Sequence, residues 1–261
     1  MDWLLNLSVP AMTLVVLALV YLVTAVIYLV VTHLATGERA RAFKAVSPGM
    51  LPPLSVVFAL LIAFLASQVW SEAERASTAV NREASSLRAA VLLADDFPGG
   101  PDARMRELIR QHIQTAVREE WPTMARGGAT LTIVPVALGQ ALRLALSLDP
   151  KTPGQSIAQR EMVTALQTAL DARRQRIVLS GSRVNGVKWG AVLVQAALML
   201  IAIAMVHSDN PTANRIILGL FATCVATAIL LVAANSRPFS GAISVQPTLL
   251  QQVMPEAGSG T

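Results

Sequence analysis

The chain has 261 residues, of which 54% are hydrophobic and only 14% are charged, with a formal net charge of +5 at pH 7. About a quarter of the residues in a soluble domain are charged, so this composition excludes an ordinary soluble protein. The positive charge is spread along the middle of the chain. It forms no dense basic stripe, so a nucleic-acid-binding protein is also excluded.

Four apolar runs without Asp, Glu, Lys or Arg cover residues 11–34, 51–69, 189–206 and 216–234. Each is near the roughly 20 residues that cross about 30 Å of hydrocarbon. Lipid cannot satisfy open backbone groups, so all four runs are predicted to be transmembrane helices. The first run follows Met-Asp-Trp and lacks the basic start of a signal peptide, so we expect it to be retained.

The segment between the second and third runs is predicted to be helical. Residues 71–94 contain no Gly or Pro, and apolar residues recur there at helical spacing. After the turn "FPGGPD", Asp102 is expected to cap a second helix, which Pro122 should stop. Two further helices are expected over residues 136–148 and from 155 to beyond 176.

Residues 123–135 are ambiguous, because "ATLTIV" has the composition of a short strand. The overall prediction is an all-α membrane protein of four transmembrane helices, with a soluble helical bundle inserted between spans 2 and 3. The predicted parts are spans 1 and 2 in 1–70, the soluble domain in 71–187, spans 3 and 4 in 188–236, and a C-terminal tail in 237–261.

An even number of spans on each side of the middle segment places it on the same side as both termini. Arg and Lys near the span ends are more numerous on that side, so the positive-inside rule favours a cytoplasmic soluble domain in a multi-pass inner-membrane protein. The basic loop 36–49, which flanks the often dominant first span, argues for the opposite orientation.

No constellation of catalytic residues emerges from the sequence. His33, His112 and His207 follow no metal-ligand spacing, and there is no phosphate-binding loop or nucleophile elbow. The acid pairs 95–96 and 119–120 lie at expected helix ends, where solvated carboxylates are ordinary. The sequence therefore predicts no enzyme, no metal site and no cofactor.

The second run carries two stripes of residues at four-residue spacing. The first comprises Pro52, Val56, Leu60 and Phe64, and the second comprises Ala59, Ala63 and Ser67. Small residues at this spacing let helices approach closely, and a ring of apolar side chains around an axis forms a constriction that gates by dewetting. The alternative is that any membrane helix offers such stripes by chance.

The run continues without a break into polar helix, and "PLSVVFALLIAFLASQVWSEAERASTAVNREASSLRAA" resembles the second, pore-lining helix of the bestrophins, which are pentameric anion channels. "EEWPTM", "RRQRIVLSGSRV" and "SRPFSGAISVQP" are similar to a family of bacterial membrane proteins described as bestrophin-like. The residues that carry these motifs are Glu120, Trp121, Pro122, Arg237, Pro238, Phe239, Ser240 and Gly241.

The resemblance implies a homo-oligomeric ion channel in the lipid bilayer, with a pentamer as one candidate and anions as the candidate ions. The bestrophin neck would fall on Pro52, Val56 and Leu60, with Phe64 continuing the stripe. Val56 departs from that family, where an aromatic residue is usual, and the calcium clasp of animal bestrophins has no counterpart, so calcium gating is not implied. The main alternative is a non-conducting scaffold or sensor whose helical domain binds a partner, and a membrane enzyme is the third interpretation.

Several motif residues also have plain structural interpretations. Arg237 suits a helix C-terminus, Phe239 a membrane-interface anchor and Gly241 a turn. The other possibility is that the tail docks on the soluble domain or on a neighbouring subunit. Trp121 is interpreted as a packing residue, and Glu83 as part of a solvated or ion-paired face more than as a selectivity ring.

Overall fold

The computed structural model describes residues 7–46, 48–128, 131, 134–182, 184–241 and 243–256. Across these residues every regular element is a helix, which confirms the all-α prediction. Four helices are long and apolar enough to cross a membrane. The chain divides into unit 1, residues 1–71 and 183–236, and unit 2, residues 72–182 and 237–261.

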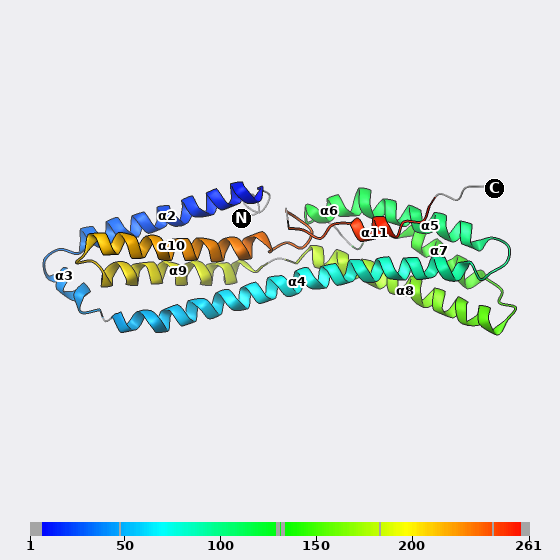
Figure 1. Cartoon of the computed structure of the whole chain (residues 1–261), viewed down its shortest axis with the longest axis horizontal. Helices are drawn as coiled ribbons and strands as arrows, with labels where there is room; N and C mark the ends of the chain where they lie inside the picture. The colour runs from blue at the N-terminus through cyan, green and yellow to red at the C-terminus, as the bar shows by residue number, and fades with distance from the viewer. Residues whose placement is uncertain are drawn as a thin grey trace. The chain divides into compact units, whose positions relative to one another are not determined.

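Unit 1 contains the four candidate spans. Helices α2 (Val9–Leu34), α9 (Gly186–Val206) and α10 (Pro211–Ala234) run side by side, as Figure 1 shows. The short helices α3 (Gly37–Lys44) and η1 (Pro48–Met50) lead into α4 (Leu51–Ala94). Pro52 and Pro53 lie in the first turn of α4, where the missing N–H groups would have no helical partner anyway.

Unit 2 contains the remainder of α4 and six further elements. These are α5 (Pro101–Thr115), the π-helix η2 (Ala116–Glu120), α6 (Trp121–Ala125), α7 (Val136–Ser147), α8 (Pro153–Ser180) and α11 (Thr248–Gln252). Their apolar sides meet in a core that includes Leu87, Ile109, Leu138 and Leu166, all with at most 1% of their surface exposed. The periodic apolar residues of the sequence therefore form the core of this unit.

Two details differ from the sequence predictions. Asp102 does not cap α5, because the cap position is Gly100 and Asp102 lies in the first turn, 3.7 Å from Arg106. Pro122 does not end the helical segment that begins with α5 either, because η2 and α6 continue it to Ala125. The strand considered for 129–134 falls largely outside the described residues.

Candidate functional site

Five charged or titratable side chains are buried together in unit 2. Glu83 on α4 and Arg176 on α8 have no exposed surface, and His112 on α5, Glu120 at the end of η2 and Arg173 on α8 are at most 4% exposed. Burying an uncompensated charge is very costly, so such a group must be held by partners. We call these five residues the buried ion network.

Arg176 lies at the centre of the network between two carboxylates. Its Nε donates to Oε2 of Glu83 at 2.8 Å, and its Nη2 donates to Oε1 of Glu83 at 3.2 Å and to Oε2 of Glu120 at 2.8 Å. The planar guanidinium thus binds Glu83 through two nitrogens and also donates to Glu120. A lysine ammonium group could not make these contacts with the same geometry.

The outer members of the network complete the hydrogen bonding of both acids. Arg173 Nε donates to Oε1 of Glu120 at 2.8 Å, and His112 Nε2 lies 2.9 Å from Oε1 of Glu83. An ionised carboxylate only accepts hydrogen bonds, so His112 Nε2 is the nitrogen that carries a proton. Two guanidinium groups balance two carboxylates, and the imidazole adds a donor.

Burial alone would raise the pKa of Glu83, because it disfavours the charged carboxylate. The charge of Arg176 and hydrogen bonds from His112 and Arg176 outweigh this effect, and they hold the pKa of Glu83 at about 2. Burial likewise acts to lower the pKa of Arg176, but Glu83 and Glu120 raise it above its ordinary value. Glu83 and Arg176 therefore both stay charged at any physiological pH.

Trp121 covers the open face of the Arg176 guanidinium. The Cζ atom of Arg176 lies 4.7 Å from the centre of the indole ring, and its Nη1 approaches Sδ of Met124 at 3.5 Å. A cation–π contact without water is worth about 2 kcal/mol. Glu120 and Trp121, both in the sequence "EEWPTM", thus contact Arg176 from two directions.

The π-helix η2 sets Glu120 and Trp121 in these positions. The backbone N–H of Trp121 donates to the carbonyl of Ala116, five residues back, where an α-helix would use the fourth. Pro122 has no N–H, and its ring would clash with the carbonyl four residues back in a regular helix. The wider turn before Pro122 removes this conflict, so the proline explains the local geometry.

The tail after α10 packs on the same tryptophan. The Phe239 ring meets the Trp121 ring edge-on, with centroids 5.6 Å apart, and only 3% of Phe239 is exposed. Gly241 at φ +90° makes the turn, which the N–H of Val245 closes onto the carbonyl of Pro238. Trp121 Nε1 then donates to the carbonyl of Val245 at 3.2 Å. Phe239 is therefore a core residue of unit 2, and its interpretation as a membrane-interface anchor is wrong.

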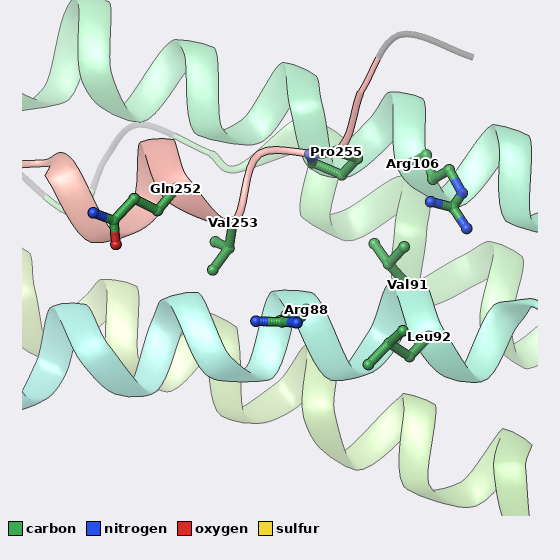
Figure 2. Close-up of a pocket in the computed structure, with 7 residues that line it drawn as sticks. All are labelled: Arg88, Val91, Leu92, Arg106, Gln252, Val253 and Pro255. Carbon is green, nitrogen blue, oxygen red and sulfur yellow. The ribbon is translucent and has the colours of Figure 1, made fainter. Parts of the chain in front are cut away.

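The last described part of the tail is fixed by α5. Arg110 donates from both Nε and Nη2 to the carbonyl of Pro255, at 3.1 and 3.0 Å. A cavity of about 260 Å³ lies beside this contact, and Figure 2 shows the side chains that line it. It is lined by Arg88, Val91, Leu92, Arg106, Gln252, Val253 and Pro255. Arg106 is paired with Asp95 at 2.9 Å, and the lining is mixed, with Arg88 and Gln252 beside the apolar side chains.

Sequence reasoning missed the network, although it named three of its members. Glu120 was expected at a solvated helix end and His112 was set aside as a lone histidine, yet both are buried and hydrogen-bonded. The sequence did contain a signal for the third member, Glu83. It follows Val80 by three residues and precedes Leu87 by four, so it lies on the buried stripe of α4. A charge inside an apolar stripe indicates a buried partner.

A family match covers most of the chain. A model of the bestrophin-like domain matches residues 18–250. The chain belongs to the bestrophin-like family. With its four apolar helices, it is a membrane protein.

Solved structures of bacterial bestrophin homologues share this fold. A mutant form of the Klebsiella pneumoniae homologue aligns with a TM-score of 0.71 at 12% identity, over 93% of this chain and 97% of that one. The Klebsiella pneumoniae homologue solved by Zn-SAD phasing aligns at 0.67 and 13% identity, over 92% and 95%. No curated protein matches the sequence.

The predicted neck residues of this bestrophin-like protein lie on one side of α4 in unit 1. Pro52, Val56, Leu60 and Phe64 are all exposed in the single chain, and Phe64 is 72% exposed. The opposite side of α4 is buried, where Phe58 packs on Phe221 of α10 with ring centroids 6.1 Å apart. Among the residues described, no three His, Cys, Asp or Glu side chains lie together as a metal site would require.

Replacing Arg176 with Met should strongly destabilise the protein. Glu83 and Glu120 would stay buried without their shared cation, and removing one partner of a buried ion pair costs about 3–5 kcal/mol. We expect a clear fall in the apparent melting temperature of the purified protein in detergent. Arg174→Met, an exposed arginine on the same helix, is the control and should change stability by less than about 0.5 kcal/mol. Equal melting temperatures for the two variants would contradict the role assigned to Arg176.

Low pH should reduce the stability of the folded protein through protonation of Glu83. Its pKa in the folded protein is about 2 against an ordinary 4.5. The unfolded chain therefore binds the proton first as the pH falls. The contribution is complete above about pH 4.5, is lost between there and about pH 2, and amounts to roughly 3 kcal/mol.

Melting temperatures measured from pH 7 to pH 3 test this dependence. Glu83→Gln should be less stable at pH 7 and should lose less stability on acidification than the parent protein. Glu107→Gln, at a partly exposed acid on α5, is the control and should keep the parental pH profile. A Glu83→Gln profile parallel to that of the parent would rule out Glu83 as the titrating group.

Phe239→Ala should loosen the tail. Removing a buried phenylalanine side chain costs about 3–5 kcal/mol, and here it also deprives Trp121 of its edge-on partner. We expect faster proteolytic cleavage within 237–256. Ile243→Ala, at an exposed position of the same segment, should leave the rate unchanged. The docking would be refuted if both variants were cut at the parental rate.

Proposed function

We propose that this bestrophin-like protein assembles into a homo-oligomer, with a pentamer as the leading candidate, that conducts ions passively along an axis lined by α4. Pro52, Val56, Leu60 and Phe64 form the hydrophobic neck, and anions are the conducted ions. Unit 2 forms a soluble helical domain in the cytoplasm, and the protein resides in the inner membrane.

The observation that carries the proposal is the exposed apolar stripe of α4. Its opposite side is already packed in unit 1, so the stripe is available to lipid or to further copies of the chain. Ala59, Ala63 and Ser67 lie exposed next to it, and small side chains at four-residue spacing suit close helix contacts. Family membership favours further copies over lipid.

The proposed neck explains why the stripe is apolar throughout. A narrow ring of Val, Leu and Phe has no group that replaces the hydration shell of an ion, so ions pass only while water fills the ring. Removing a few carbon atoms from the side chains widens such a ring and lowers the free-energy barrier to ion passage. Because about 1.4 kcal/mol of barrier corresponds to a tenfold rate, small changes in neck size should have large effects.

Native mass spectrometry in nanodiscs, followed by planar-bilayer recording, tests the proposal. We expect a closed ring of subunits with a measurable conductance, and Leu60→Ala should increase the current at least severalfold by widening the neck. Leu22→Ala, at a similarly exposed leucine of α2, is the control and should leave the current unchanged. A monomer or dimer in lipid would overturn the proposal and favour the non-conducting scaffold.

A further inference from the structure

The exposed side of α4 in unit 2 carries two arginines on one line. Arg75 and Arg82 are seven residues apart, or about two helical turns, so they lie on nearly the same face of the helix. Thr78 and Ser85 are exposed on this face as well. We call these four residues the outer face of α4.

The two arginines keep their charge free for a mobile ion. Neither Arg75 nor Arg82 has a hydrogen-bond or ion-pair partner among the residues that the structure describes. From Arg75 to Arg88 the only acid is Glu83, which lies on the buried side of the helix and is neutralised by Arg176. Glu74, exposed next to Arg75, offsets part of the charge at that end, so Arg82 is the stronger of the two.

A hydrophobic neck has no charge of its own with which to distinguish an anion from a cation. The sign of the conducted ion must therefore be set by charged groups elsewhere on the path. Symmetric assembly repeats each charge once per subunit, and a low-dielectric wall concentrates the resulting field along the axis.

We infer that Arg82, supported by Arg75, is the residue that makes the proposed channel favour anions over cations. The inference rests on the proposed function, because it requires the outer face of α4 to line the conduction path. A ring of guanidinium groups raises the local anion concentration and repels cations. The hydroxyl groups of Thr78 and Ser85 can donate hydrogen bonds to a partly dehydrated anion as it passes.

Reversal potentials in planar bilayers under a potassium chloride gradient test the inference. The parent channel should reverse toward the chloride equilibrium potential. Arg82→Glu should lower the chloride-to-potassium permeability ratio at least about fivefold, since a surface potential of several kT is inverted. Arg82→Gln should give an intermediate ratio. Arg104→Glu on α5, with the same change of charge at another exposed arginine, should leave the ratio within about twofold of the parent.

The outcomes separate the two proposals. A ring-forming parent that conducts, with the same permeability ratio in Arg82→Glu and Arg104→Glu, overturns the role of Arg82 and leaves the channel intact. A parent that conducts cations preferentially overturns the role of Arg82 and the proposed anion conduction, and leaves only the ring and its ion conduction standing. A parent that forms no ring, or conducts nothing, overturns the proposed function and the inference together. Melting temperatures of the variants, which replace exposed side chains, should match that of the parent.

Discussion

The organisation of unit 2 depends on the burial of one arginine. Arg176 has no exposed surface, and its desolvation is offset only because Glu83 and Glu120 both reach it and Trp121 covers its face. These partners come from three different elements, and His112 and Arg173 complete the hydrogen bonds of the acids. A network of this kind adds little net stability over an apolar core, and its hydrogen bonds form only when α4, η2 and α8 lie in these relative positions.

The sequence "EEWPTM" shows how a backbone irregularity supports such a network. Pro122 excludes a regular α-helix at this point, and the π-helix before it avoids the clash that its ring would cause. Glu120 and Trp121 thereby reach the same guanidinium, and the indole N–H is free to bind the tail at Val245. The proline therefore fixes where the helix widens, and the widening places Glu120 and Trp121 against Arg176.

The helices themselves were predictable because helical periodicity is a local property. The stripe Ala76, Val80 and Leu87 predicted the buried side of α4, and the charge-free runs predicted the four candidate spans. The network was not predictable from local patterns, since Glu83 and Arg176 are 93 residues apart and nothing nearby in sequence links them. Phe239 was misassigned for a related reason, because an aromatic residue just after a span suits a membrane interface and a docked tail equally well.

Neighbouring residues of α4 connect the buried network with the exposed outer face. Glu83 points inward to Arg176, and Arg82, one residue earlier and about 100° around the helix, points outward. Because the bidentate contact with Arg176 and the buried stripe hold one side of α4 against the core of unit 2, Arg82 points away from that core without any contact of its own. Arg82 can thus occupy a defined position around the helix without a partner of its own, because the buried side of α4 is held by the contact of Glu83 with Arg176.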